Sequence, residues 1–272
     1  MQVGVFAKTF PGSEPTGVLA TVRDAGFAVT QFNLACAGLP SMPDAVPDAA
    51  IDAIGAAAKA TGIGLVALSG TYNMAHPDSR MRGDGLRRLA VVIETAARLS
   101  IPLVTLCTGT RNAEDQWAHH PDNTDPSAWA DMALEIEKAL LIAEPHGVDL
   151  GIEPEQANIV TSAEDAVRLI AEMGSKRLRI VLDPANLFEQ ANLDEARAIV
   201  AEAVERTAGH VALAHAKDRF ADGRFATAGR GVVDFADFIA RLKATGFDGP
   251  LVTHGLSAEE APRVARLLKE LV

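Results

Sequence analysis

Residues Val148 to Asn158 have the sequence VDLGIEPEQAN, an apolar segment that ends in an acid followed by proline. Val148, Leu150 and Ile152 are typical of a β-strand. Pro154 has no backbone N–H and is poorly tolerated inside a central strand, so the strand is predicted to end there. Glu153 therefore lies at the carboxyl end of a strand, and its side chain faces the space above the sheet.

The same arrangement recurs three times further along the chain. Leu178 to Asn186 (LRIVLDPAN) is another apolar segment that ends in an acid followed by proline. The segments 211–215 (VALAH) and 251–254 (LVTH) end in histidine instead. Four strands are thus predicted to carry a potential metal ligand at their carboxyl ends, namely Glu153, Asp183, His215 and His254.

The rest of the chain continues an alternation of strands and helices. Strands are predicted at 1–7, 27–34, 63–69, 103–107, 148–153, 178–183, 210–215 and 250–254. Helices are predicted at about 13–26, 48–60, 86–99, 127–146, 162–173, 193–207, 235–245 and 258–271. Apolar strands separated by helices indicate βαβ units and a parallel sheet.

This alternation predicts one closed (β/α)8 TIM barrel that occupies residues 1–272 as a single domain. The four candidate ligands follow one another at intervals of 30, 32 and 39 residues, each about one βα unit. No linker is long or polar enough to divide the chain. Because the active site of such a barrel lies at the carboxyl ends of its strands, the four side chains are expected to converge.

Composition limits the possible partners and location. The net charge is −11, with 36 acidic against 25 basic residues, so a nucleic-acid partner is not expected. No apolar run approaches the ~20 residues of a membrane span, and the N-terminus lacks a signal-peptide pattern. We therefore expect no membrane partner and a soluble, cytoplasmic protein. Cys36 and Cys107 are expected to be buried thiols. No Walker or GxGxxG motif suggests a nucleotide cofactor.

Two carboxylates and two imidazoles form a mixed donor set that suits Mn²⁺, Co²⁺, Fe²⁺ or Zn²⁺ better than Ca²⁺. Mg²⁺ remains among the candidate cofactors. Each residue alone has an ordinary structural alternative: an acid can cap the next helix, and a histidine can be a hydrogen-bonded core residue. Four such residues at consecutive strand ends favour a divalent-metal site.

Several motifs resemble the sugar phosphate isomerase/epimerase family, the xylose-isomerase-like TIM barrels. They are EPEQAN, the acid of LDPAN, HAKD at 215–218 and GRGVVDF at 229–235, and HAKD is the most specific. The resemblance implies that Glu153, Asp183 and His215 bind a divalent metal, with a fourth ligand on the eighth strand. There the family usually has glutamate, and this chain has His254. Asn186 stands where many members have histidine.

The substitution at the eighth strand affects the expected mechanism. Many epimerases of the family use two metal-bound glutamates, on the fifth and eighth strands, as an acid and base pair. With His254 in the second place, either this histidine is a ligand and Glu153 or a loop residue is the base, or it leaves the metal and titrates near neutrality. We favour the first alternative.

Other polar residues at the same end of the barrel are candidates for substrate binding, each with a structural alternative. Asn73 and His76 could equally be solvated loop residues. Arg111 could bind a carboxylate or phosphate, or pair with Glu114 or Asp115. Trp117 could stack on a sugar or pack against another subunit of a homo-oligomer. The substrate-binding candidates are Asn73, His76, Arg111, Trp117, Asn186 and Arg230.

The resulting hypothesis is a metal-dependent isomerase or epimerase of a small sugar, sugar acid or sugar phosphate. Glu153 would remove a proton next to a carbonyl, and the metal with Lys217 would stabilise the enediolate. Lys217 could instead form a salt bridge with Asp218. The alternatives are a dehydratase of the dehydroshikimate or inosose type, and a sugar-binding barrel without catalysis. An abasic-site endonuclease fits less well, because it needs more histidines and a basic DNA-binding face.

Overall fold

Eight parallel strands close into a barrel in the computed structural model, which describes residues 1–272. The ring closes where β1 pairs with β10, and every other strand pairs with its neighbours in sequence order. This confirms the predicted TIM barrel. The strands are β1 (Gln2–Phe6), β2 (Val29–Phe32), β3 (Gly64–Ser69), β4 (Leu103–Leu106), β5 (Asp149–Ile152), β6 (Leu178–Leu182), β7 (Val211–Ala216) and β10 (Pro250–Thr253).

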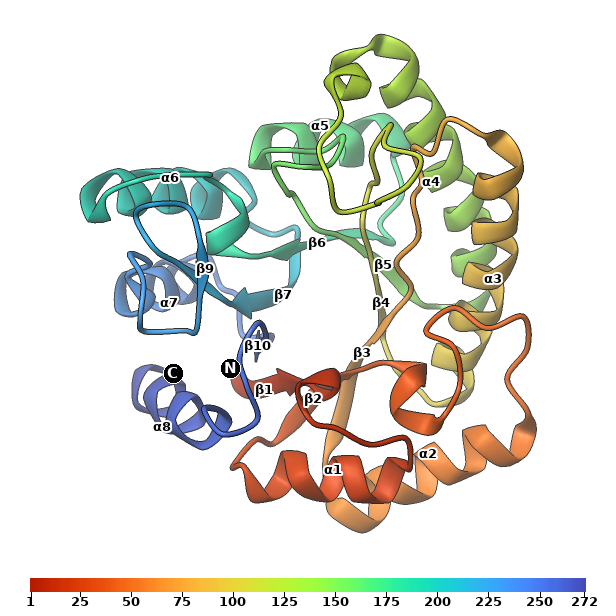
Figure 1. The fold of residues 1–272 in the computed structure, drawn as a ribbon, viewed down its shortest axis with the longest axis vertical. Coiled ribbons are helices and arrows are strands. Elements are labelled where there is room, and N and C mark those ends of the chain that lie inside the picture. Colours follow the sequence, from red (N-terminus) through yellow and green to blue (C-terminus); the bar gives the residue numbers. More distant parts are fainter.

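Helices form an outer ring around the strands (Figure 1). They are α1 (Pro15–Asp24), α2 (Asp48–Thr61), α3 (Ser79–Arg98), α4 (Pro126–His146), α5 (Ala163–Met173), α6 (Leu193–Arg206), α7 (Phe235–Ala244) and α8 (Ala261–Leu271). Four short 3-10 helices follow strands or precede helices: η1 (Ala7–Thr9), η2 (Leu34–Ala37), η3 (Pro121–Thr124) and η4 (Pro184–Asn186). None of the helices is apolar over a stretch long enough to cross a lipid bilayer.

The apolar residues divide into two layers. The larger core lies between the strands and the helices, and it includes Cys36. The smaller cluster takes one residue from each of five strands and fills the inside of the barrel: Ala67, Leu103, Val181, Leu213 and Val252. Cys107 is buried too, and burial raises the pKa of Cys36 to about 11 and that of Cys107 to about 12.

The predicted boundaries differ most at loops. α3 begins at Ser79 rather than near residue 86, because the Asp78 side chain accepts a hydrogen bond from Arg80 N and caps a first turn that has few apolar residues. No strand was predicted in the segment 217–234, which follows β7. It contains a small antiparallel hairpin of β8 (Asp218–Arg219) and β9 (Phe225–Ala226).

Candidate metal centre

The four predicted ligands enter the barrel because of the two-residue period of their strands. Val181, Leu213 and Val252 belong to the apolar layer inside the barrel. On β5 the corresponding position is Gly151, where an added Cβ would lie 2.8 Å from the Val181 side chain. The residues two positions further along point to the same side of the sheet, which is the barrel interior, and lie nearer to the carboxyl ends of the strands. These side chains are Glu153, Asp183, His215 and His254.

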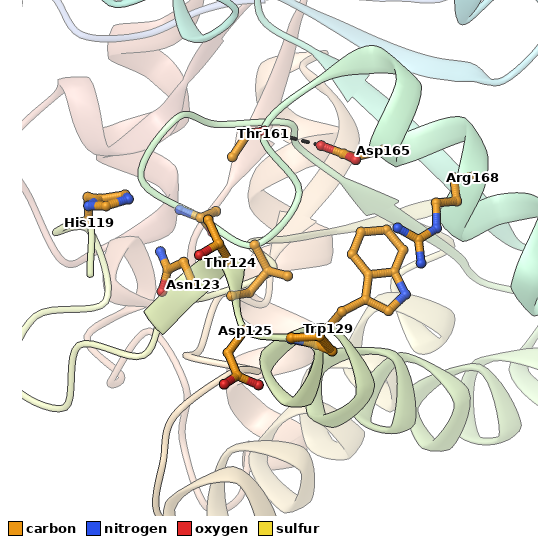
Figure 2. Close-up of a pocket in the computed structure, with 11 residues that line it drawn as sticks. His119, Asn123, Thr124, Asp125, Trp129, Thr161, Asp165 and Arg168 are labelled. Carbon is orange, nitrogen blue, oxygen red and sulfur yellow. Dashed lines mark hydrogen bonds between the residues drawn. The ribbon is translucent and has the colours of Figure 1, made fainter. Parts of the chain in front are cut away.

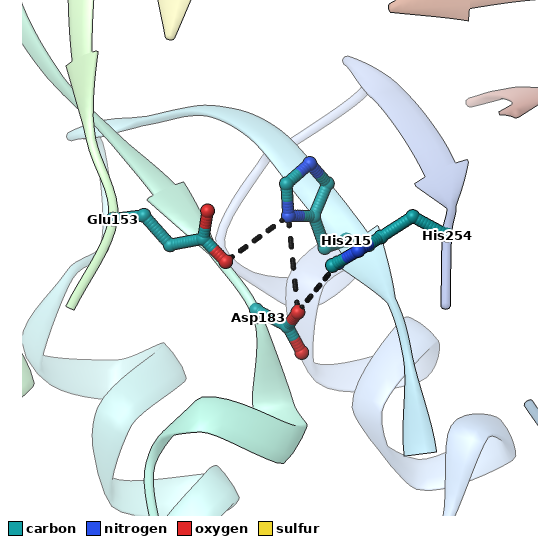
Figure 3. A group of neighbouring side chains, drawn as sticks. All are labelled: Glu153, Asp183, His215 and His254. Carbon is teal, nitrogen blue, oxygen red and sulfur yellow. Dashed lines mark hydrogen bonds and ion pairs between the residues drawn. The ribbon is translucent and has the colours of Figure 1, made fainter. Parts of the chain in front are cut away.

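The four side chains converge on one point (Figure 3). One ligand atom from each lies within 4.8 Å of the others. His215 Nδ1 is 3.2 Å from Glu153 Oε1 and 3.8 Å from Asp183 Oδ2. His254 Nε2 is 2.8 Å from Asp183 Oδ2. The sequence therefore identified a real cluster, built from four strands that are adjacent in the barrel.

Charge pairing inside the cluster keeps both acids ionised. Burial by itself would raise the pKa of Asp183, but Lys217, a hydrogen bond from His254 and the field of His215 hold it well below its ordinary value. Burial would likewise raise the pKa of Glu153, and His215 lowers it again. Burial, followed by the neighbouring His215, lowers the pKa of His254. Ionised carboxylates and a neutral imidazole are the forms that bind cations.

The donor set fits a divalent metal ion. Two imidazole nitrogens and two carboxylates face one another at distances that one central cation would bridge. Glu153, Asp183, His215 and His254 would hold such an ion. The ion would neutralise two acids that otherwise share one small, mostly buried space.

A bridge of hydrogen bonds links this cluster to Lys217. Asn186 Nδ2 donates to Glu153 Oε1 at 2.8 Å, and Lys217 Nζ donates to Asn186 Oδ1 at 2.6 Å. Lys217 Nζ is also 3.4 Å from Asp183 Oδ2. The alternative salt bridge between Lys217 and Asp218 does not form, because the Asp218 carboxylate accepts backbone N–H groups of its own loop.

Glu153, His215 and His254 of the cluster line a polar cavity of about 430 Å³, and Asp183 is fully buried beside them. Trp117 lies at this cavity with half of its surface exposed, and Lys217 and Asn186 line it too. The opposite wall comes from the first four strands and the loops that follow them. Its side chains, which the sequence had not singled out, include Lys8, Gln31, Asn33, Ser69, Thr105 and Gln116.

Glu155 is another cavity residue, and it was not among the site residues predicted from the sequence. Burial, with a further contribution from the adjacent Glu153, raises its pKa to about 7. Its carboxyl group accepts a hydrogen bond of 3.3 Å from Asn158 Nδ2. The second acid of the EPEQ motif was a signal in the sequence, but it lies beyond Pro154, where the strand was predicted to end.

Asn73 and His76, two of the predicted substrate-binding residues, form hydrogen bonds between loops and do not line this cavity. Asn73 Oδ1 accepts hydrogen bonds from the backbone N–H groups of Ala75 and Thr110. His76 Nδ1 accepts from Asp78 N, and its Nε2 contacts Ala113 O. As substrate contacts, Asn73 and His76 remain predictions.

Arg111 has a similar structural role. Its guanidinium pairs with Asp131 at 2.8 Å and donates to Ala75 O at 3.1 Å and to Ser127 Oγ at 3.1 Å. The partners considered from the sequence, Glu114 and Asp115, do not pair with it. A substrate anion would have to compete with Asp131, so the structure adds no support for Arg111 as a substrate-binding residue.

Arg230 is exposed outside the cavity, and only its backbone N–H has hydrogen-bond partners, the Asp218 carboxylate and Thr227 O. Gly231 explains the Gly-Arg-Gly motif around it: an added Cβ would lie 2.1 Å from Arg219 O, so only glycine permits this close approach. A substrate contact from the Arg230 side chain therefore also remains a prediction.

A second cavity, of about 390 Å³, lies between the start of α4 and the loop before α5 (Figure 2). Its polar groups are largely paired with one another. Arg168 stacks on the Trp129 ring at 4.0 Å, and Thr161 Oγ1 donates to Asp165 Oδ2 at 3.1 Å. It shares no residue with the metal cluster.

A protein-family model and several solved structures match this chain. The model of the xylose isomerase-like TIM barrel family matches residues 19–271. No curated relative matches the chain by sequence. A 3-keto-D-glucoside 4-epimerase from E. coli has a similar structure, with a TM-score of 0.78, 18% identity and 99% of each chain covered.

Two further structures show the same fold. The D-psicose 3-epimerase of Clostridium cellulolyticum H10 has a TM-score of 0.77 at 15% identity, over 100% of this chain and 99% of that one. An L-ribulose 3-epimerase has a TM-score of 0.75 at 19% identity, over 99% of this chain and 92% of that one. With its barrel, its cluster and a family match that spans most of its length, the chain belongs to the xylose isomerase-like TIM barrel family.

Proposed function

We propose that this protein is a divalent-metal-dependent isomerase or epimerase of a small sugar, sugar acid or sugar phosphate. The observation that carries the proposal is the convergence of two carboxylates and two imidazoles within 4.8 Å, three of which line a polar cavity. Sugar epimerases among the proteins of similar fold support a carbohydrate substrate.

Glu153, Asp183, His215 and His254 would hold the metal, which we expect to be Mn²⁺, Co²⁺, Zn²⁺ or Mg²⁺. When bound, the ion would polarise a substrate carbonyl and so acidify the neighbouring C–H bond. His254 acts as a ligand in this proposal. Its lowered pKa favours the neutral imidazole, and its Nε2 already faces Asp183.

Glu153 is the proposed base. Its lowered pKa keeps it ionised at neutral pH, and the hydrogen bond from Asn186 orients Oε1. Lys217 holds its ammonium group beside the cluster, where it donates a hydrogen bond to the substrate oxygen that gains negative charge. The Asn186 amide bonds both Glu153 and the Lys217 ammonium group and thus sets their relative position.

Epimerisation also requires a group that returns a proton to carbon. Glu155 is suited to this because its pKa of about 7 leaves the carboxyl group partly protonated at neutral pH. It lines the same cavity as Glu153 and occupies the loop after β5. A loop acid would take the place of the second glutamate that the eighth strand lacks.

The test is proton exchange. The metal-loaded protein is incubated in D2O with a panel of ketoses, their acids and their phosphates, and deuterium next to the carbonyl is followed by NMR and mass spectrometry. We expect exchange with at least one substrate, accompanied by the epimer or the aldose. Loss of a water molecule instead would identify a dehydratase. No exchange across the whole panel would contradict the proposal.

A further inference from the structure

Gln31 is a polar residue in the middle of a fully buried strand. All four residues of β2 are buried, and Gln31 itself is 7% exposed. Its side chain lies in the barrel interior and reaches the cavity that contains the metal cluster. A buried amide must find partners for its oxygen and its nitrogen, so these partners indicate what the residue does.

Gln31 has a partner for each end of its amide. Its Oε1 lies 2.9 Å from His215 Nε2. Its Nε2 donates to Ser69 Oγ and to Thr105 Oγ1, each at 3.2 Å. Since the amide nitrogen is used by these two hydroxyl groups, the oxygen remains for His215. With the amide in this orientation the oxygen accepts, so His215 Nε2 carries the hydrogen and donates it.

This contact determines which nitrogen of His215 is free to bind a cation. The ring directs its other nitrogen, Nδ1, at Glu153 and Asp183. With the hydrogen held on Nε2, a neutral ring presents the lone pair of Nδ1 to the cluster. We infer that Gln31 is a positioning residue of the metal centre, which fixes the orientation and the tautomer of His215. The inference rests on the metal site of the proposed function.

The second histidine has no comparable support. His254 Nε2 contacts Asp183, and its other ring nitrogen has no hydrogen-bond partner within the protein. Its side chain is 22% exposed, against 4% for His215. The network of Gln31, Ser69 and Thr105 therefore connects three strands on the far side of the barrel to one ligand only. His215 is the ligand whose geometry is set before any ion binds.

The experiment measures metal affinity, not turnover. The full chain is stripped with EDTA, and the dissociation constant of Co²⁺ is measured by competition with a fluorescent chelator. Gln31→Met keeps the side-chain length but cannot accept the hydrogen bond, and we expect it to weaken Co²⁺ binding by roughly 10–100-fold. Gln31→Glu restores an acceptor and should return the affinity to near the wild-type value.

Asn123→Leu is the matched control. Asn123 is a buried amide outside the cavity, and its Oδ1 accepts hydrogen bonds from Thr110 Oγ1 and Arg111 N and contacts no ligand. Its loss should leave the Co²⁺ affinity unchanged. If Gln31→Met does not fold, Thr105→Val removes one hydrogen bond from the Gln31 amide with little change of shape, and it should still weaken binding measurably.

The outcomes separate the two proposals. If the wild-type protein binds Co²⁺ and the variants Gln31→Met and Thr105→Val bind it as tightly as Asn123→Leu, the positioning role is overturned while the metal site stands. If the wild-type protein binds neither Co²⁺, Mn²⁺ nor Zn²⁺, the metal site of the proposed function is overturned. A loss with Gln31→Met that Gln31→Glu rescues supports the inference.

Discussion

At the scale of single residues, one amide organises the proposed chemistry. Asn186 donates through Nδ2 to Glu153 and accepts through Oδ1 from Lys217. An amide can orient both charged groups without adding a charge of its own, so Glu153 stays available as a base and Lys217 stays cationic. A histidine at this position, which the family resemblance suggested, could not accept and donate in the same way while charged.

We predict that Glu153→Gln lowers kcat for proton exchange by about 10²–10⁴-fold, the usual contribution of a general base. The amide has nearly the same shape but cannot take up the proton. Rates of deuterium incorporation at saturating substrate measure the effect. Glu137→Gln, an exposed position on α4, serves as the control. A Glu153→Gln protein that still exchanges at more than a tenth of the wild-type rate would show that another group is the base.

Lys217→Met should lower kcat by roughly 10²–10³-fold, as removal of one donor to a developing negative charge does elsewhere. KM should change much less, because the interaction strengthens in the transition state. Both constants come from initial rates of epimer formation. An increase in KM alone would assign Lys217 to substrate binding instead.

At the scale of secondary-structure elements, the strand ends were predictable and the loops were not. An acid before proline defines where a parallel strand ends, so Glu153 and Asp183 could be placed from the sequence. The role of Gln31 could not be predicted, because it depends on His215, which is 184 residues away in the chain. Loop residues such as Arg111 were ambiguous for the same reason: their partners lie on other elements.

The conformation of the loop after β7 depends on one buried side chain, Asp218. Asp218 accepts hydrogen bonds from the backbone N–H groups of Arg219, Gly229, Arg230, Gly231 and Val233, at 2.7–3.1 Å. It is fully buried. The Asp218 carboxylate thus holds together the loop that contains the β8–β9 hairpin, and it follows Lys217 directly in the chain.

Asp218→Ala should therefore lower the free energy of unfolding by about 3 kcal/mol or more, since several buried donors lose a charged acceptor. Urea denaturation measures the change, and limited proteolysis should cut the loop between β9 and α7 first. Asp222→Ala in the same excursion is the control, because Asp222 pairs with Arg224 at the surface. Equal stability of the two variants would rule out the anchoring role.

At the scale of the whole molecule, the four ligands come from β5, β6, β7 and β10, which are consecutive in the barrel. The other wall of the cavity comes from the first four strands and contributes uncharged hydrogen-bonding groups and Lys8. A substrate would therefore lie between a metal-binding half and a polar half. A metal ion would also link four strand ends, so its binding should be visible in the stability of the entire barrel.

A divalent ion that binds only the folded chain should stabilise it by roughly 2.7 kcal/mol at a hundredfold excess over its Kd. Since ~1 kcal/mol raises the Tm of a chain of this size by ~2–4 °C, the shift should reach several degrees. Thermal melts of EDTA-stripped protein with and without Mn²⁺, Co²⁺ or Zn²⁺ measure it. His254→Ala should reduce the shift, and His76→Ala should not, because His76 binds Ala113 O and Asp78 N outside the cluster.

The metal-dependent shift should also depend on pH in a defined direction. Protons compete with the metal for His254, and the pKa of this residue lies below its ordinary value because burial disfavours the imidazolium. His254 therefore stays neutral through pH ~6.5, the ordinary pKa of histidine, and its protonation should weaken metal binding only below that value. The shift should be constant from about pH 8 to about pH 7 and decline only below ~6.5, the ordinary pKa of histidine. A shift that already declines above that pH, or one that His76→Ala abolishes while His254→Ala preserves it, would show that the ion binds elsewhere.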